Sequence, residues 1–198
     1  MEKSKYIVKK INSESEIDSV PKAYIDKYVW DNSYTPVAFA QLGFIEGKGL
    51  CFKMTCYESN PKAVYKNYND PVWYDSCLEF FISPCNTDAR YLNIEMNSAG
   101  AYLCGLRYSR ENKVDIATVA DPPEVTAEKY PDHWTVKGIL TLKTVEKVFG
   151  KFDKKFKGNL YKCGDKTDIP HFGMWSPIGT SAPDFHRPEY FGDFEIED

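Results

Sequence analysis

The chain has 198 residues, a formal net charge of −4 and 42% hydrophobic residues, a composition that is typical of a folded globular protein and excludes a disordered chain. Lysine and arginine are scattered along the sequence instead of gathered in one stripe, which argues against nucleic-acid binding or an anionic membrane surface. No apolar run approaches the roughly 18 to 20 residues that a membrane span needs. We therefore predict one domain over residues 1–198, with a neutral or small partner.

The amino terminus and the cysteines bear on the compartment. Residues 1–10 carry charges and lack the apolar core of about 7 to 15 residues found in a secretory signal. The spacing of the cysteines contains no CxxC or other metal-knuckle pattern. The six cysteines are Cys51, Cys56, Cys77, Cys85, Cys104 and Cys163. We expect free thiols in a reducing, cytoplasmic setting, whereas a sequence that has lost its leader would be extracellular.

The residue types favour strands over helices. Aromatic residues make up 15% of the chain. Residues 37–45 and 50–57 flank a short glycine-bearing loop, which predicts a hairpin. Further strands are expected at residues 77–83, 90–97, 101–108, 134–142, 171–176 and 192–196. This spacing predicts an all-β, antiparallel β-sandwich of immunoglobulin-like type.

Helix is expected only in short pieces. The best helical segment is residues 144–149, which Gly150 would end in the usual C-terminal manner. Residues 152–168 are rich in lysine and weakly patterned, and we predict a long surface loop there.

Two predicted strands carry polar side chains in unusual places. In residues 91–97, Asn93, Glu95 and Asn97 alternate with apolar residues, which predicts one buried and one polar face. Glu79 interrupts a run that is otherwise apolar on both faces. Because an unpartnered buried charge is costly, Glu79 should either line a cleft or satisfy backbone donors or an arginine.

These polar residues suggest a sugar site if the two strands are neighbours in one sheet. Carboxylates accept hydrogen bonds and amides both donate and accept, which suits the hydroxyl groups of a sugar. Trp73 lies in a predicted loop just before Glu79, where its ring could stack on the apolar face of a pyranose. A core tryptophan is the alternative for Trp73.

Four segments, residues 73–82, 91–100, 134–136 and 171–192, together resemble the family 9 carbohydrate-binding modules. The most specific parts are Asp-Ser at residues 75–76 before Glu-x-Phe at residues 79–81, and the closing His-x-Pro-x-x-Phe-Gly at residues 186–192. The order and spacing agree over about residues 34–196. The resemblance implies a β-sandwich of the DOMON type that grips the end of a sugar chain between two aromatic rings without catalysis, beside a separately encoded enzyme.

The resemblance also implies roles for individual residues. Trp73 matches one ring of the clamp, Glu79 the carboxylate that hydrogen-bonds the sugar, and Asn93 an amide of the central strand. The second clamp position falls on Phe185 instead of a tryptophan, and nearby Trp175 and His186 are candidates for that face. Glu95 and Asn97 complete the predicted carbohydrate-binding set. A structural calcium ion is implied by the family, although no local aspartate-rich loop calls for it.

Other classes of function stay open at this stage. A glycosidase would use Glu79 and Glu95 as its two carboxylates, and Cys163 with His171 would be a nucleophile pair. A protein-interaction sandwich needs no sugar site. A haem-binding DOMON domain would hold iron through histidine and methionine. The candidates for that role are His171, His186, Met54, Met96 and Met174.

Overall fold

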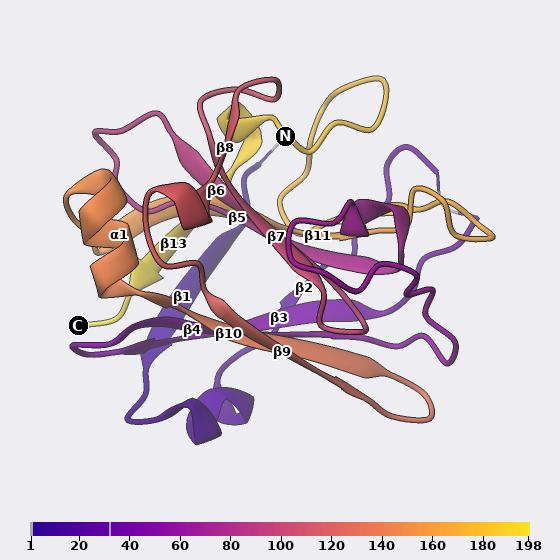
Figure 1. Ribbon diagram of the computed structural model, residues 1–198, viewed down its shortest axis with the longest axis horizontal. Coiled ribbons are helices and arrows are strands. Elements are labelled where there is room, and N and C mark those ends of the chain that lie inside the picture. Colours follow the sequence, from indigo (N-terminus) through magenta and orange to yellow (C-terminus); the bar gives the residue numbers. More distant parts are fainter. Residues whose placement is uncertain (1, 32) are drawn as a thin grey trace.

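The structure is a computed structural model that describes residues 2–31 and 33–198, and its strands form two stacked sheets (Figure 1). Sheet A has the strand order β8, β7, β6, β5, β11, β13 and the first part of β1, with β12 beside β11. Sheet B has the order β1, β3, β4, β10 and β9, with β2 beside β3. The described strands are β1 (Lys5–Lys10), β2 (Ala23–Tyr24), β3 (Ala38–Ile45), β4 (Gly49–Cys56), β5 (Cys77–Ser83), β6 (Tyr91–Asn97), β7 (Tyr102–Arg107), β8 (Lys113–Asp115), β9 (Glu124–Lys129), β10 (Trp134–Thr141), β11 (Lys155–Cys163), β12 (Phe172–Met174) and β13 (Gly192–Ile196).

The predicted all-β sandwich is confirmed. Neighbouring strands are antiparallel except where β1 runs parallel to β13 and to β3. Strand β1 joins the two sheets, because Lys5 to Val8 pair with β13 whereas Lys9 and Lys10 pair with β3. The predicted hairpin is β3 and β4, and its turn places Gly47 at a φ of 72°, a conformation that glycine adopts without strain.

Helical structure is confined to one α-helix and short 3-10 turns. Helix α1 (Leu142–Phe149) begins two residues earlier than the sequence indicates and ends at Gly150, as predicted, with a left-handed φ of 82°. The hydroxyl of Thr141 accepts a hydrogen bond from the Thr144 backbone N–H and caps the helix. The 3-10 turns are η1 (Glu14–Ser19), η2 (Val72–Tyr74), η3 (Ile116–Thr118) and η4 (Pro188–Tyr190). No helix in the described part of the chain has the length and apolar character to cross a membrane.

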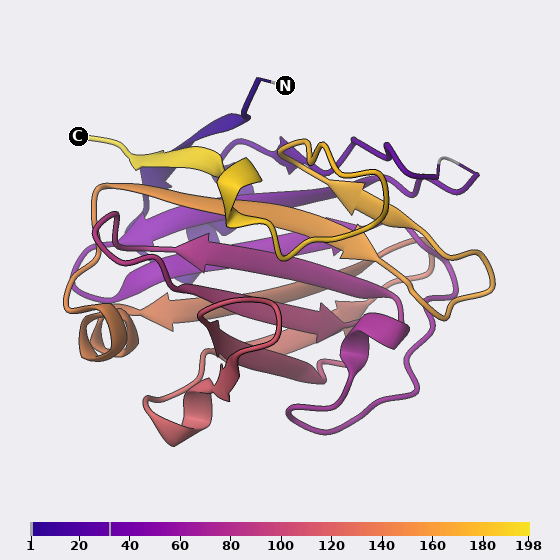
Figure 2. The same cartoon turned by 90° about the horizontal axis from the view of Figure 1, so that it is seen from above.

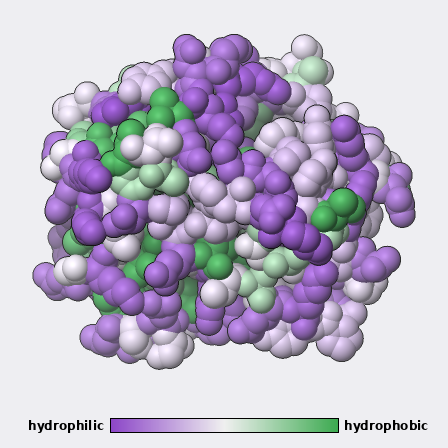
Figure 3. Space-filling view, in the orientation of Figure 1, coloured by the Kyte–Doolittle hydropathy of each residue, from purple (hydrophilic) through white to green (hydrophobic). Residues whose placement is uncertain are grey.

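The main hydrophobic core lies between the two sheets. Strand β6 contributes Leu92, Ile94 and Met96, and strand β4 of the opposite sheet contributes Phe52 and Met54. The period-two prediction for β6 is therefore correct on its apolar side. On the face of the molecule that Figure 3 shows, hydrophilic residues predominate and hydrophobic residues form small, separated patches. All six cysteines are buried and free.

The expected surface loop at residues 152–168 is wrong, because most of it is β11, a central strand of sheet A between β5 and β13 (Figure 2). Phe156 and Leu160 point into the main core, which is the period-two pattern of a strand. The pattern is hard to read in the sequence because Lys162 occupies a fully buried position in it. The structure gives this lysine buried partners, so its charge does not require the surface.

Candidate carbohydrate-binding cleft

The outer face of sheet A brings the predicted polar residues into one array. In the antiparallel register, Glu79 of β5 lies directly opposite Glu95 of β6 on one side and Tyr161 of β11 on the other. Asn93 lies opposite Phe81 of β5 in the next row of the same face. The prediction that Glu79 and the polar row of β6 share one sheet face is therefore confirmed.

A cleft of about 250 Å³ opens over this array. Its floor is the strands of sheet A, and its walls are η2, the end of β7 with the following turn, and residues 183–186. The lining residues are Trp73, Glu79, Glu95, Arg107, Arg110, Asp165, Phe172, Pro183, Asp184, Phe185 and His186. The array is thus recessed between loops.

Glu79 forms the buried part of the cleft floor. Its side chain is 3% exposed, and its Oε1 accepts a hydrogen bond from the Cys163 thiol at 2.8 Å. Burial, followed by the proximity of Cys163 and Glu95, raises the pKa of Glu79 well above its usual range. The shift favours the protonated carboxyl group, which can donate a hydrogen bond as well as accept one.

Glu95 is held by a chain of polar contacts. Asn93 Nδ2 donates to Glu95 Oε1 at 2.5 Å, and Arg107 Nε donates to Asn93 Oδ1 at 3.0 Å. Gly105 is required beside this chain, because a Cβ atom there would lie 2.5 Å from Asn93 Oδ1. The second oxygen of Glu95, Oε2, is buried and has no hydrogen-bond partner among the residues that the structure describes. A buried acceptor without a partner is costly, so Oε2 is available to a ligand in the cleft.

The charge of Glu95 depends on two opposing effects. Burial raises its pKa to about 7, although the hydrogen bond from Asn93 and the charge of Arg107 both lower it. The floor of the cleft therefore offers Glu79, whose protonated form is favoured by burial, and Glu95, whose pKa is about 7.

Aromatic side chains form two parts of the cleft wall. Trp73 lies in η2 and is half-buried against a small apolar cluster that includes Cys77 and Leu103. Phe185 stacks on Tyr161 with ring centroids 4.0 Å apart and planes 9° from parallel. Trp73 and Phe185 thus reach the same cleft from distant segments, and Trp73 is not a residue of the main core.

His186 adds a neutral donor or acceptor to the wall. Its Nδ1 lies 2.9 Å from the Tyr91 hydroxyl oxygen. Burial and the charges of Arg107 and Arg110 lower the pKa of His186 to about 3, so the ring is uncharged at neutral pH. Arg110 also forms an ion pair of 2.5 Å with Asp184, which ties the turn after β7 to the loop that carries His186.

Three predicted site residues lie outside the cleft lining. Asn93 is fully buried, and its side chain donates a hydrogen bond that positions Glu95. Asn97 is also fully buried, and its side chain bonds the backbone of Ala99, Ala101 and Tyr65. Trp175 lies in the main core, where its ring packs 4.6 Å from that of Phe194.

The cleft also contains residues that the sequence did not indicate. Arg107 is the clearest, because it lies opposite Tyr91 in the register of β6 and β7. A cross-strand alignment of those two segments would therefore have placed it on the polar face. Arg110, Asp165 and Asp184 lie in turns whose position depends on tertiary contacts, and no local pattern marks them.

The other predicted pairings are not brought together. The Cys163 thiol hydrogen-bonds Glu79, whereas His171 Nε2 hydrogen-bonds Lys162. Cys163 and His171 therefore do not form a nucleophile pair. The predicted haem ligands are also apart, because Met54 and Met96 lie in the main core whereas His186 lines the cleft.

The group of metal-ligating side chains within the described residues is Cys77, Glu79 and Cys163. Two sulfur atoms and one carboxyl group do not suit calcium, which prefers six to eight oxygen ligands. Calcium thus stays a prediction of the family resemblance.

A β-sandwich with acidic groups, arginine and aromatic rings around a sheet-face cleft defines a class of sugar-binding modules, and comparison with known proteins agrees. The sequence matches carbohydrate-binding family 9 over residues 10–196, so the chain belongs to that family. Family 9 modules bind carbohydrate without catalysing a reaction, so the protein is a non-catalytic carbohydrate-binding protein and not a glycosidase. No curated protein matches the chain.

Solved structures agree with the fold. A candidate carbohydrate-binding protein from Bacteroides uniformis is 26% identical, with a TM-score of 0.81 over 99% of this chain and 100% of that one. A family 9 module from Caldicellulosiruptor kristjanssonii, solved in complex with cellotriose, is 12% identical with a TM-score of 0.71 over 98% of this chain and 94% of that one. Its structure in complex with glucose gives a TM-score of 0.69 at 12% identity, over 98% and 96% of the two chains.

Proposed function

We propose that the cleft binds a single sugar ring or the end of an oligosaccharide, with Trp73 and Phe185 against its apolar faces and Glu79, Glu95 and Arg107 on its hydroxyl groups. The observation that carries this proposal is Glu95 Oε2, which is buried at the cleft and has no partner. A ligand hydroxyl would satisfy it, and the desolvation cost of leaving it unpaired would be removed.

The chemistry of the floor fits a neutral polyol. Glu79 has one side-chain hydrogen-bond partner in the described part of the chain, the Cys163 thiol, which leaves its second oxygen for a ligand. A protonated Glu79 donates a hydrogen bond and Glu95 accepts one, so neighbouring sugar hydroxyl groups can bind both as acceptors and as donors. The cleft volume of about 250 Å³ is below the ~300 to 1,000 Å³ of drug-sized pockets, which favours one or two rings over a long chain.

The aromatic wall supplies the apolar part of the interaction. Phe185 is already fixed by its stacking on Tyr161, so its ring loses little conformational entropy when a sugar binds. Phenylalanine offers a smaller face than tryptophan, so we propose that Trp73 provides most of the stacking area. The complexes of the Caldicellulosiruptor module suggest glucose and short glucose oligomers as the first ligands to test.

The test is a glycan array on the intact chain, followed by calorimetric titration of the best sugar. Glu95→Gln should weaken binding by about tenfold, because a neutral amide replaces an ionisable acceptor and adds a donor beside Asn93. Glu128→Gln is the matched control, since Glu128 is exposed on β9 of the opposite sheet. Equal sugar affinities of the Glu95→Gln variant and the wild type would overturn the proposal.

A further inference from the structure

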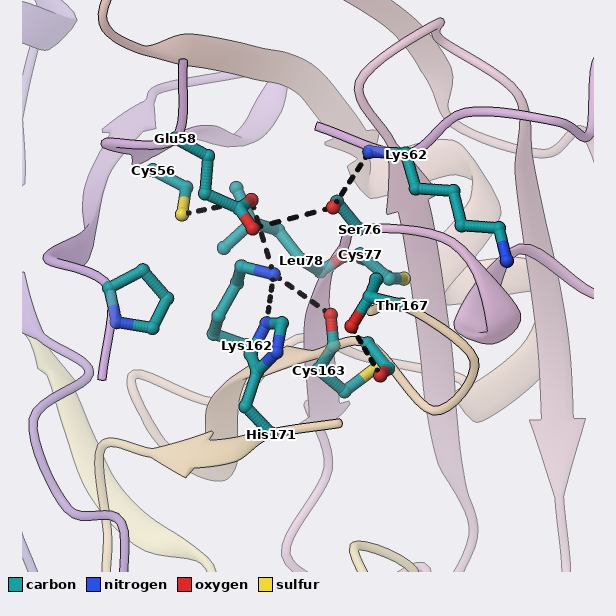
Figure 4. A network of polar contacts seen from close by, with 12 residues as sticks. Cys56, Glu58, Lys62, Ser76, Cys77, Leu78, Lys162, Cys163, Thr167 and His171 are labelled. Atoms are coloured by element: carbon teal, nitrogen blue, oxygen red, sulfur yellow. Dashed lines mark hydrogen bonds and ion pairs between the residues drawn. The ribbon is translucent and has the colours of Figure 1, made fainter. Parts of the chain in front are cut away.

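Two thiols and a carboxyl group meet where β5 and β11 pass beside the cleft. Cys77 lies directly opposite Cys163 in the antiparallel register, and Glu79 is two residues along β5 on the same face. One ligand atom of each side chain lies within 4.8 Å of the other two. Figure 4 shows Cys77 and Cys163 beside the polar network around Lys162.

The donor set has a clear metal preference. Thiolate ligands select Zn²⁺ over calcium or magnesium, and Zn²⁺ also accepts a carboxylate oxygen. With Zn–S bonds of about 2.3 Å and Zn–O bonds of about 2.0 to 2.2 Å, donors around a tetrahedral ion lie roughly 3.5 to 3.8 Å apart. The three side chains therefore need only small adjustments to share one ion. Binding of the ion would displace the thiol protons of Cys77 and Cys163 and the carboxyl proton of Glu79, and the Cys163 to Glu79 hydrogen bond of 2.8 Å would open.

The surroundings leave one coordination position free. Cys77 is 0% and Cys163 1% exposed, and their neighbours include the apolar side chains of Val72, Ala101 and Leu103. Glu79 lines the cleft, so an ion could enter from there. Three protein ligands with an open fourth position is the arrangement of zinc sites that accept water or a ligand.

A disulfide between Cys77 and Cys163 is the competing occupant of this place. Glu79 would have no part in a disulfide, whereas it completes the donor set of a metal site.

We propose that Cys77, Cys163 and Glu79 form a binding site for one zinc ion whose fourth position opens into the cleft. The metal site shares Glu79 with the proposed sugar site, but its test does not require that a sugar binds. The intact, reduced and metal-free chain is titrated with Zn²⁺ by calorimetry and with Co²⁺ by absorption spectroscopy, without sugar. We expect one ion per chain, with the near-ultraviolet charge-transfer band of Co²⁺ bound to thiolate and the visible bands of a tetrahedral ion.

Variants separate this site from adventitious binding. Cys77→Ala and Cys163→Ala should each weaken Zn²⁺ binding by at least about tenfold and remove the charge-transfer band. Cys104→Ala is the matched control, because Cys104 is a fully buried cysteine of sheet A that faces the main core. It should bind Zn²⁺ like the wild type.

Circular dichroism establishes which variants fold, and Glu79→Gln, which leaves no cavity, should also weaken Zn²⁺ binding by about tenfold. Three results would overturn the proposal: no stoichiometric binding by the wild type, wild-type affinity in the Cys77, Cys163 and Glu79 variants, or a Cys77–Cys163 disulfide in the native protein by peptide mapping. A failed sugar titration leaves this metal titration unchanged, so the two proposals fail separately.

Discussion

Glu79 and Glu95 lie directly opposite each other on β5 and β6, and their side chains are only 3% and 4% exposed. Two acids this close in a low-dielectric site cannot both ionise freely, and they titrate as a pair. Burial raises the pKa of Glu79 well above its usual range and that of Glu95 to about 7. Near neutral pH, the folded protein therefore binds more protons at this pair of carboxyl groups than the unfolded chain does.

The first prediction is a pH dependence of stability. Because the folded pKa of Glu95 lies above its usual value of 4.5, its contribution is fully present below about pH 4.5 and is lost as the pH rises through about 7. The contribution of Glu95 to the free energy of unfolding should fall between about pH 5 and about pH 8, whereas the lowered pKa values of His171 and His186 act in the opposite direction below about pH 6.5. Glu95→Gln should lack part of this fall, on the order of 1 to 3 kcal/mol. Urea unfolding at both pH values measures it.

Glu128→Gln is the control for this prediction, because the side chain is exposed on β9 and should leave the pH dependence unchanged. The prediction fails if the wild type and Glu95→Gln lose the same free energy of unfolding between the two pH values.

The second prediction concerns Asn97, which the sequence placed in the sugar site. Its Oδ1 accepts hydrogen bonds from the backbone of Ala99 and Ala101, and its Nδ2 donates to Tyr65 O and Asp75 Oδ2. Asn97→Ala leaves these buried groups unpaired and should lower the free energy of unfolding by about 2 to 4 kcal/mol. Sugar affinity of the folded protein should change by less than about threefold, as measured by calorimetry below the melting temperature.

Asn112→Ala is the control for stability, because Asn112 is exposed in the turn after β7. A large loss of affinity in Asn97→Ala with an unchanged melting temperature would contradict this assignment and return Asn97 to the binding site.

The strands with a regular apolar period were predictable. β5 and β13 have the bounds that the sequence predicts, because β5 is a short apolar run that is buried on both faces and the apolar residues of β13 alternate. β11 was missed because a lysine stands at an apolar position of that pattern. Lys162 is tolerated because Glu58 and His171 reach it from other parts of the chain, and the carbonyl group of the adjacent Cys163 also accepts a hydrogen bond from it. Such compensation is tertiary and leaves no local signal.

The floor of the cleft was more predictable than its walls. Glu79 follows from a carboxylate within an apolar run and Glu95 from alternation along β6, and the two strands prove to be neighbours. The loop walls depend on contacts between distant segments, such as the ion pair of Arg110 with Asp184. Trp175 is a counter-example. Its position in the sequence made it a candidate for the aromatic clamp, but its ring packs in the main core.

The third prediction concerns the buried ion pair shown in Figure 4. Lys162 Nζ lies 3.3 Å from Glu58 Oε2 and 2.7 Å from His171 Nε2. Burial alone would raise the pKa of Glu58, but the charge of Lys162 and the hydrogen bond from Trp134 lower it, so Glu58 is ionised. Lys162→Met leaves that charge without its counter-ion and should cost about 3 to 5 kcal/mol of unfolding free energy.

The double variant Lys162→Met with Glu58→Gln removes both charges and should recover a substantial part of that loss, which urea unfolding measures. Lys157→Met is the control, because Lys157 is an exposed lysine of the same strand. If the double variant is as unstable as the sum of the two single variants, the pair is not coupled and this account of the buried lysine is wrong.

The last prediction is that Trp73 contributes to binding and not to the main core. Trp73→Ala removes a stacking surface worth on the order of 1 to 3 kcal/mol and should weaken sugar binding by about 10- to 100-fold. Because Trp73 is half-buried in a small satellite cluster, stability should fall by less than the roughly 3 to 5 kcal/mol of a core tryptophan. Tyr57→Ala is the control, since Tyr57 is 45% exposed and does not line the cleft. Thermal melts and calorimetric titrations on the same samples decide the case. A Trp73→Ala variant that melts far below the wild type yet binds sugar with wild-type affinity would assign this ring to folding alone.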